Sequence, residues 1–348
     1  MIKILFAFCL LILNSCDELD SLMGNEDNGV MESESWVFTA NEGNYGSSNG
    51  SISMIGDAGQ VFITDFLGQT VQALEVYNDK LIVLINGDSK LKIFDITTQG
   101  LSMPGIEVDL EGSSPRDLVV VNDKIYFTNW NSQDIKIFNL FNYVLESPIS
   151  VPGLPEGIIE KDGTLWVAIT MNSDWSPGQS VLQYDIQTGS LLRTVDVGSG
   201  PVSLEVINED IYVSRTYYDA EFNPNHGMSK FSEIHSPVLI QQYGSGVPCG
   251  GSVLSINNQI YRTLSNEENE GGIVALNEDL TFNASTKIGS YPQSYIYHVE
   301  VIDDQIWFAL TNYSDYNSVK VISFSGDELA SYDVGIAPGD FAKWQNND

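Results

Sequence analysis

The 348-residue sequence is poor in basic residues, with 15 lysines and arginines against 47 aspartates and glutamates and a formal net charge of −32. Proteins that bind nucleic acids neutralise phosphates with basic side chains, so this composition excludes a nucleic-acid partner. Docking on an anionic membrane through a basic patch is excluded for the same reason. High net charge often accompanies disorder, but 43% of the residues are hydrophobic and 11% are aromatic. That apolar content is sufficient for a folded core.

Cysteine and histidine are equally scarce, with three of each. Cys9 lies in the predicted signal peptide described below and would be removed with it, and Cys16 would be acylated. Cys249 would then have no disulfide partner, and we interpret it as a buried, inert thiol. The histidines lack the spacing of a zinc or copper centre; they are His226, interpreted as a loop residue, His235 and His298. These absences predict no disulfide and no metal site.

Motifs of catalysis and cofactor binding are missing as well. The sequence contains no Gly-x-Ser-x-Gly elbow, no phosphate-cradling loop and no calcium-loop pattern. Carboxylate pairs such as Glu267-Glu268 indicate solvated loop charge rather than an acid/base dyad. We therefore predict no cofactor and no catalytic residues, and we do not expect an enzyme.

No apolar run is long enough to span a membrane, which takes about 20 residues. The run at 4–13 follows Lys3 and fits the apolar region of a signal peptide. Leu13-Asn14-Ser15-Cys16 resembles a bacterial lipobox, which predicts a lipoprotein signal peptide at 1–15 and lipidation of Cys16. The alternative is an ordinary signal peptide with an incidental cysteine. The lipid would be the only membrane anchor.

Residues 16–35 form an acidic segment, with seven acids and no basic or aromatic residue from position 17 onward. We expect a disordered, self-repelling tether there. Acids directly after a lipidated cysteine resemble the surface-export signal of some Gram-negative lipoproteins, whereas Asp17 resembles a signal for retention in the inner membrane. We expect a lipid-anchored protein at the outer membrane or cell surface, with the periplasmic face as the alternative.

A single unit recurs from residue 36 onward. Each copy has a polar turn and then a short alternating strand, as in Asn122-Asp123-Lys124-Ile125-Tyr126-Phe127. The aligned positions are 36, 81, 125, 165, 211, 260 and 306, a spacing of 40 to 49 residues. Such a period, built from short strands without helical periodicity, is typical of a β-propeller. The sequence therefore predicts an all-β, seven-bladed β-propeller over residues 36–348.

The two ends of the repeat region predict how the ring closes. Residues 337–344 have the form of an inner strand with no second strand after it, while Trp36 begins a second strand with no inner strand before it. Pairing these strands completes the seventh blade and removes the free edges. A linear β-solenoid, the alternative, leaves a half-blade at each end unexplained.

The loops between second and third strands are long, variable and aromatic. They cover 41–50, 128–134, 170–179, 214–227, 263–271 and 311–317, and their aromatic residues are Tyr45, Trp130, Trp175, Tyr217, Tyr218, Phe222, Tyr313 and Tyr316. Loops on a rigid scaffold commonly carry binding residues. Aromatic rings beside polar groups suit a flat or ring-shaped ligand, so these loops are candidate ligand-binding segments. The alternative is that several rings pack against their own loops.

The inner strands should bring a second set of groups to the mouth of the central channel. Counting back from each turn places Gln72, Arg116, Glu156, Tyr297 and His298 there. Arg116 could clamp a phosphate or carboxylate. It could equally form a structural salt bridge with Asp117 or with an acid on a neighbouring blade, and the sequence leaves both open.

The opening of the repeat region resembles a known family. Asn41-Glu42-Gly43-Asn44-Tyr45-Gly46, followed by Gly50-Ser51-Ile52-Ser53, is similar to the opening motif of YncE-like surface-layer propeller lipoproteins. Pro115-Arg116-Asp117 and Pro155-Glu156-Gly157 resemble the blade repeat of that family. Its members include the BtuG-type lipoproteins, which capture cobalamin. The resemblance implies a seven-bladed ring, an outer-membrane lipid anchor and no catalysis.

The leading hypothesis is a lipid-anchored, monomeric envelope propeller that binds a small molecule on its long-loop face. The resemblance makes cobalamin a candidate ligand and an outer-membrane transporter a candidate partner. A scaffold for a protein partner at the outer membrane is the first alternative, and a propeller hydrolase such as a lactonase is the second.

Overall fold

The computed structural model describes residues 32–232, 237–247, 251–264 and 270–346. The predicted signal peptide, Cys16, residues 17–31 of the predicted tether, His235, Cys249 and the Glu267-Glu268 pair lie outside the described residues. Within these ranges, no helix is both long and apolar enough to cross a membrane.

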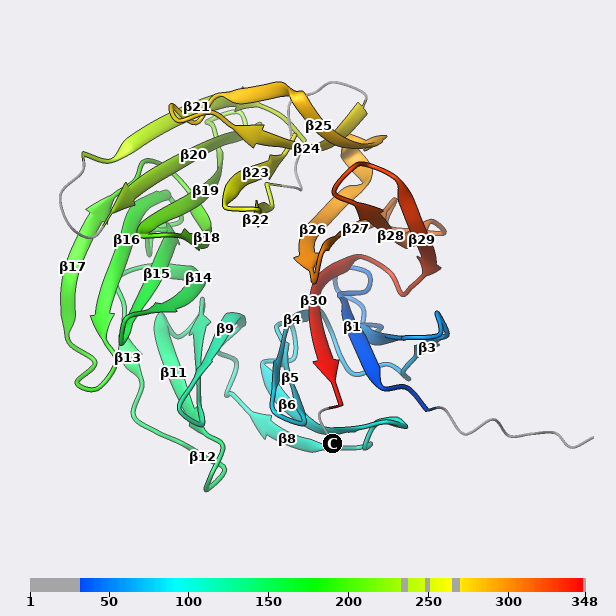
Figure 1. The fold of residues 1–348 in the computed structure, drawn as a ribbon. Helices are drawn as coiled ribbons and strands as arrows, with labels where there is room; N and C mark the ends of the chain where they lie inside the picture. Colours follow the sequence, from blue (N-terminus) through cyan, green and yellow to red (C-terminus); the bar gives the residue numbers. More distant parts are fainter. Residues whose placement is uncertain (1–31, 233–236, 248–250, 265–269, 347–348) are drawn as a thin grey trace, which may run out of the picture.

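The described residues form seven antiparallel sheets arranged as blades around a central axis (Figure 1). Blade 1 contains β1 (Ser35–Asn41), β2 (Ser51–Gly56), β3 (Val61–Ile63) and β30 (Pro338–Gln345). Blade 2 contains β4 (Val71–Tyr77), β5 (Lys80–Ile85), β6 (Lys90–Thr97), β7 (Gly100–Leu101) and β8 (Ile106–Asp109). Blade 3 contains β9 (Pro115–Val121), β10 (Lys124–Asn129), β11 (Asp134–Asn139), β12 (Val144–Leu145) and β13 (Ile149–Ser150).

The other four blades have four strands each. Blade 4 contains β14 (Leu154–Lys161), β15 (Thr164–Met171), β16 (Pro177–Asp185) and β17 (Leu191–Asp196), and blade 5 contains β18 (Pro201–Ile207), β19 (Asp210–Tyr218), β20 (Pro224–Ser232) and β21 (Leu239–Ser245). Blade 6 contains β22 (Val253–Ile256), β23 (Gln259–Thr263), β24 (Glu270–Leu276) and β25 (Phe282–Pro292). Blade 7, which contains β26 (Ile296–Ile302), β27 (Gln305–Thr311), β28 (Asn317–Ser323) and β29 (Glu328–Asp333), follows the short 3₁₀ helix η1 (Gln293–Tyr295).

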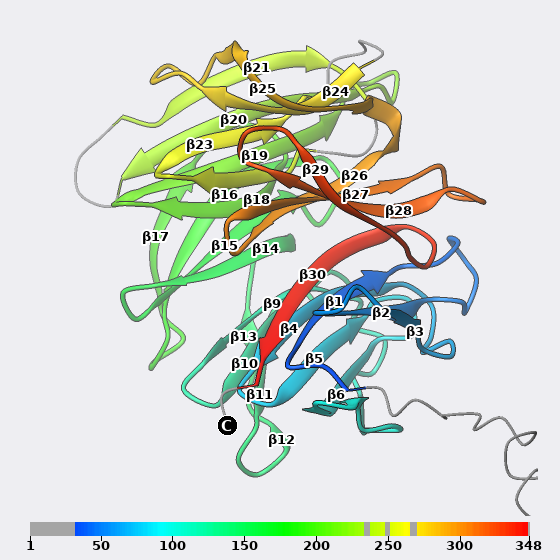
Figure 2. The ribbon, with the colours of Figure 1, turned by 45° about the vertical axis from the view of Figure 1, so that its right-hand side comes forward.

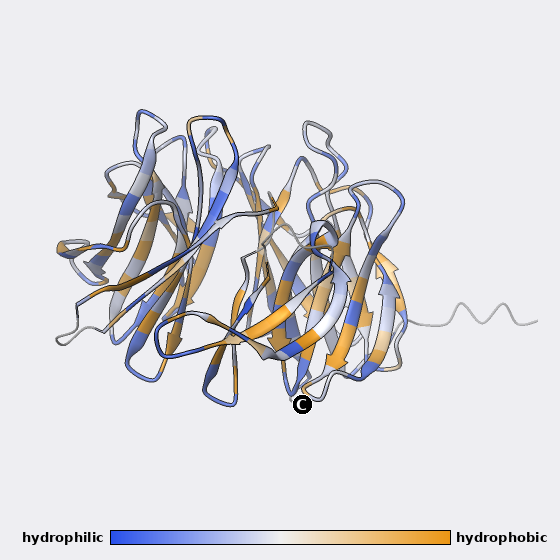
Figure 3. Ribbon diagram, turned by 90° about the horizontal axis from the view of Figure 1, so that it is seen from above, coloured by the Kyte–Doolittle hydropathy of each residue, from blue (hydrophilic) through white to orange (hydrophobic). Residues whose placement is uncertain are grey.

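The hydrophobic core is divided among the contacts between neighbouring blades. Each of the seven apolar clusters joins residues of two adjacent blades, including the pair formed by blades 7 and 1. The second strand of a blade is covered on both faces, so β5, β15 and β27 have almost continuous buried runs. Figure 3 shows hydrophobic segments along the strands and mostly polar turns and loops at the two rims of the ring. Stacking of blades therefore supplies the burial that one small sheet lacks.

The ring closes as the sequence predicts. β30 pairs antiparallel with β1 from Ser35↔Gln345 to Asn41↔Pro338, so the C-terminal strand is the inner strand of blade 1. Figure 2 shows β30 beside β1. The prediction of a seven-bladed, all-β propeller closed by its C-terminal strand is confirmed.

The alignment of the first repeat was wrong by one residue. Ile125 packs in the cluster between blades 2 and 3 and so faces the preceding blade. In blade 1 the residue that faces the preceding blade is Val37, whereas Trp36 packs against blade 2. Because strand side chains alternate, a shift of one residue moves a side chain to the other face. Val37 is therefore the equivalent of Ile125.

Two of the predicted loops are shorter than expected, because strands extend into them. β19 and β20 remain paired as far as Tyr218↔Pro224, so the predicted loop 214–227 shrinks to a turn at 219–223. The predicted loop 170–179 likewise shrinks to 172–176. Pairing continues because unpaired backbone groups are costly. The carboxylate of Asp219 accepts the backbone N–H groups of Glu221 and Asn223 and holds the turn.

Candidate functional site

The inner strands enter the ring at the long-loop face through irregular pairing. β4, β9, β14, β18, β26 and β30 each have a register shift close to their first residues. Proline begins three of these strands (β9, β18 and β30) and is the second residue of β14, and it cannot donate to the ladder. A bulge places two residues opposite one and redirects their side chains. The groups that meet around the axis come from these segments.

Arg116 lies among a group of side chains at the mouth that also includes Gln72, Glu156, Glu42 and Tyr297, and we call this group the upper layer. The charge of Arg116 is already paired. Its Nη2 lies 2.6 Å from Oε1 of Glu156, its Nε donates to both oxygens of the same carboxylate, and its Nη1 donates to Gln72 at 2.9 Å. The guanidinium carbon lies 4.5 Å from the centre of the Trp130 ring. Burial alone would lower the pKa of Arg116, but Glu156 raises it above its ordinary value. Of the two open interpretations, the structure therefore shows the salt bridge to a neighbouring blade.

Glu42 and Tyr297 form the other side of the upper layer. The Tyr297 hydroxyl hydrogen-bonds Glu42, whose pKa is raised by burial. Gly339 leaves room for this glutamate, because a Cβ at that position would lie 2.7 Å from its Oε1. The Tyr297 ring packs edge-on against Tyr313 at 5.7 Å. Glu42 is not among the predicted site residues, although it stands in the motif 41–46 that carries the family resemblance.

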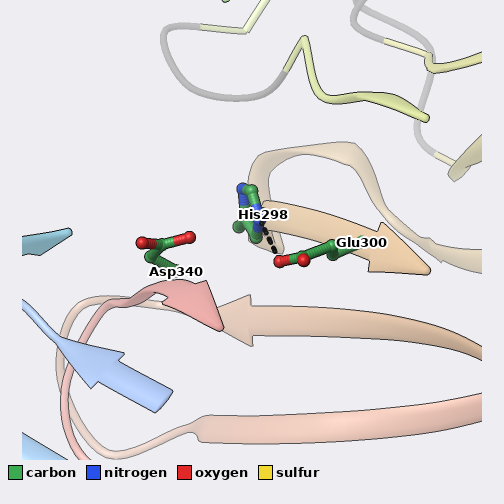
Figure 4. Close-up of side chains that lie close together, drawn as sticks. All are labelled: His298, Glu300 and Asp340. Atoms are coloured by element: carbon green, nitrogen blue, oxygen red, sulfur yellow. Dashed lines mark hydrogen bonds and ion pairs between the residues drawn. The ribbon is translucent and has the colours of Figure 1, made fainter. Parts of the chain in front are cut away.

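A second layer beneath the mouth is rich in carboxylates. Nε2 of His298 lies 3.5 Å from Oε2 of Glu300, and Asp340 completes a group in which one nitrogen or oxygen atom of each side chain lies within 4.8 Å of the other two (Figure 4). Burial would lower the pKa of His298, but the Glu300 carboxylate raises it above its ordinary value. Burial, with repulsion from Glu300, raises the pKa of Asp340 to about 8.

Two further glutamates belong to this layer. Glu75 on β4 and Glu205 on β18 hold the same strand position as Glu300 on β26, between two apolar residues. Burial raises the pKa of each to about 7, and in both cases repulsion from Glu300 adds to the effect. The carboxylates of Glu75 on blade 2 and Glu205 on blade 5 therefore both interact electrostatically with that of Glu300 on blade 7.

The aspartates of the layer also join blades. Oδ2 of Asp117 accepts the Ile158 N–H of blade 4 at 2.9 Å, and Oδ2 of Asp340 accepts the Leu74 N–H of blade 2 at 2.7 Å. These acceptors stabilise neighbouring inner strands in register. Burial nevertheless raises the pKa of Asp117 to about 6.

A groove of about 280 Å³ lies on the long-loop face between blades 4 and 5. Its lining is mostly apolar and consists of Thr170, Met171, Trp175, Pro177, Thr216, Tyr217, Tyr218, Asp219, Ala220 and Phe222. Trp175 is 64% exposed and Phe222 is 84% exposed. Trp175 meets Trp130 edge-on at 6.2 Å, and Trp130 in turn stacks on Arg116, so ring contacts connect the groove to the Arg116 layer.

The predicted site residues fall into two connected sets. Arg116, Glu156, Trp130 and Tyr313 lie around the mouth with His298 in the layer beneath it, while Trp175, Tyr217 and Tyr218 line the groove. Tyr45 belongs to neither set, because its side chain is 100% exposed and does not line the groove. The repeat period predicted where the strands lie. It did not predict the lengths of the hairpins that bring Trp175 beside Tyr217 and Tyr218.

His226 is not the loop residue that the sequence predicted. It is 1% exposed on β20, with Nδ1 3.1 Å from the Thr216 hydroxyl and Nε2 2.9 Å from the Val247 carbonyl. Burial lowers the pKa of His226 to about 4. A neutral, hydrogen-bonded imidazole at this position is a structural element of blade 5.

The sequence matches no family model, and no curated protein matches it. Solved structures do resemble the fold. A protein from Lactobacillus plantarum has a TM-score of 0.63 and 12% identity over 89% of this chain and 99% of that chain. A putative 6-phosphogluconolactonase from Bacteroides uniformis has a TM-score of 0.61 and 12% identity over 87% and 98%. Apo AztD from Citrobacter koseri has a TM-score of 0.54 and 11% identity over 89% and 98%. At these identities the likeness establishes the β-propeller fold alone.

Proposed function

We propose that the long-loop face binds a ring-containing small molecule in the groove between blades 4 and 5. The exposed rings of Trp175 and Phe222 beside a mostly apolar hollow carry this proposal. Such hollows, with a few polar groups at their rim, are the usual form of small-molecule sites. The groove volume suits one ring system, and a larger ligand would extend along Trp130 toward the axis.

Charge at the mouth narrows the ligand class. Arg116 is neutralised by Glu156, and Glu42 adds a further carboxyl group beside them. The mouth therefore offers little attraction to a polyanion and favours a neutral or cationic ligand. Together with the resemblance of residues 41–53 to the opening of the YncE-like family, which includes the BtuG-type lipoproteins, this makes a corrinoid the first ligand to test.

Titration calorimetry of the full chain with cobalamin tests this function. We expect saturable heat, and Trp175→Ala should weaken binding about tenfold, equivalent to about 1.4 kcal/mol, because a stacking surface is lost. Phe141→Ala is the matched control, since this 89% exposed ring follows β11 and lies outside the groove. Absence of heat at high micromolar cobalamin would remove the corrinoid, and equal losses in both variants would remove the groove.

The exposed aromatics favour one other function, that of a scaffold for a protein partner. Large exposed rings are also common at protein interfaces. Shortening the turn at 219–223 should then abolish capture of an envelope protein while cobalamin gives no heat. A lactonase activity is tested with a panel of lactones, with and without Ca²⁺, and turnover on any of them would replace both binding functions.

We further propose that the chain is anchored in the cell envelope by a lipid on Cys16. The support is the sequence of residues 1–16 alone. Cys16→Ser should move the protein from the membrane fraction to the soluble fraction and prevent incorporation of labelled fatty acid. Retention of the variant in the membrane fraction would refute this anchor.

A further inference from the structure

The second layer, beneath the mouth, brings an imidazole and two carboxylates together from two blades. His298 and Glu300 project from β26 of blade 7, and Asp340 projects from β30 of blade 1. Figure 4 shows the three side chains close together, with the contact between His298 and Glu300 dashed. Closure of the ring creates this arrangement, because it places blade 1 beside blade 7.

We infer that His298, Glu300 and Asp340 form a binding site for a divalent transition-metal ion such as Zn²⁺. Ligand atoms about 2.0–2.1 Å from a tetrahedral ion lie roughly 3.4 Å from one another. Nε2 of His298 and Oε2 of Glu300 are 3.5 Å apart, which already matches that spacing. Asp340 offers the third ligand atom within 4.8 Å of both.

The surroundings of the three residues supply an independent reason for a cation. Glu75 and Glu205 face the same region, and neither carboxylate has a hydrogen bond or ion pair within the described ranges. The guanidinium of Arg116 in the upper layer is already paired with the Glu156 carboxylate. Partial burial without a nearby cation disfavours the ionised form of a carboxylate, and a divalent ion bound at His298 would offset the negative charge of Glu75 and Glu205.

The ligand types select the metal class. An imidazole nitrogen with two carboxylates suits zinc and its first-row neighbours, whereas calcium and magnesium prefer all-oxygen sites. Three protein ligands leave at least one coordination position for water or another ligand. The sequence showed no metal spacing because the third ligand lies 40 residues after the second and becomes adjacent only in the closed ring.

Calorimetric titration of the chelator-treated full chain with Zn²⁺ tests the site. We expect one equivalent to bind, and His298→Gln and Asp340→Asn should each weaken binding at least about tenfold. Asp304→Asn is the matched control, because it removes an exposed carboxylate at the turn between β26 and β27 of the same blade. Ca²⁺ should bind more weakly than Zn²⁺. The absorption spectrum of bound Co²⁺ should change in both ligand variants and stay unchanged in the control.

Zn²⁺ affinity that is unchanged in His298→Gln and Asp340→Asn would overturn the inference, and so would an equal loss in Asp304→Asn. Circular dichroism establishes that each variant is folded, and Glu300→Gln replaces any variant that is not. The groove takes no part in these measurements. Failure of zinc binding therefore leaves the ligand proposal standing, and failure of cobalamin binding leaves this one.

Discussion

Arg116 and Glu156 join blades 3 and 4 through side chains that are only 21% and 14% exposed. They hold equivalent places in consecutive units, each directly after a proline at the start of the inner strand, Pro115 in β9 and Pro155 after Leu154 in β14. The sequence left open whether Arg116 is a ligand clamp or part of a salt bridge. Alignment of consecutive units would have favoured Glu156, since neighbouring blades present the same position to each other.

Breaking this pair should cost more than removing it. Arg116→Met leaves Glu156 without its cation and should lower the free energy of unfolding by about 3 kcal/mol, the lower end of the range for removing one partner of a buried pair. The double variant Arg116→Met/Glu156→Gln should recover most of that loss. Urea unfolding measures both. A double variant no more stable than the single one would show that the pair itself contributes the stability.

Glu75 should make the stability of the fold depend on pH. Its pKa rises to about 7 in the folded protein, against an ordinary value of 4.5. A raised carboxyl pKa means that the folded state binds the proton more tightly than the unfolded state. The contribution of Glu75 to stability is therefore complete below about pH 4.5 and is lost as the pH rises through 7. In chelator-treated protein, Glu75→Gln should therefore raise the free energy of unfolding by about 2 kcal/mol at pH 8 and change it little at pH 4.5. Equal effects at the two pH values would exclude this charge as the cause.

For strands and turns, the sequence predicted which strands are present better than it predicted where each strand begins and ends. Alternating residues and polar turns are local signals, and they located the second strand of every blade. The hairpin of β19 and β20 continues past its predicted end because backbone pairing overrides the polar composition of 214–227. The register of β1 depends on whether Trp36 or Val37 faces blade 7, and that is a tertiary contact.

Inner strands of neighbouring blades approach closely at Gly157. A Cβ there would lie 2.4 Å from the carbonyl oxygen of Val202 on β18 and 3.2 Å from the Cα of Ser203. Gly157→Ala should destabilise the protein by about 1–3 kcal/mol because β14 and β18 must move apart. Thermal unfolding measures the loss. Addition of Val202→Ala should not restore stability, since the clash is with the main chain, and a recovery would contradict this geometry.

For the whole molecule, the repeat period and the two half-blades were sufficient to predict a closed seven-bladed ring. The functional groups were less accessible from the sequence. His298, Glu300 and Asp340 meet because blades 7 and 1 are neighbours, and Glu42 fits against β30 because residue 339 is a glycine. Such meetings depend on side-chain directions at bulges, which a one-dimensional pattern does not contain.

Trp344 should be essential to closure. It is 5% exposed, packs between blades 1 and 2, and donates its Nε1 hydrogen to Asp79 at 2.9 Å. Trp344→Ala should lower the free energy of unfolding by about 3–4 kcal/mol because it opens a cavity beside β1. Phe66→Ala, at a ring that is 72% exposed, should change it by less than about 0.5 kcal/mol. Chemical denaturation compares the two, and similar effects would refute a special role for the last strand.

Pairing of β30 with β1 also sets a time at which the molecule can finish folding. A chain made from its N-terminus holds β1 with an open edge until residues 338–345 have been synthesised. Until then the contacts of β30 in the clusters that join blade 1 to blades 7 and 2 are missing. Unpaired edges invite association with other chains. A nascent or prematurely ended chain is therefore exposed to aggregation and proteolysis, while the completed chain conceals the same edge within its first blade.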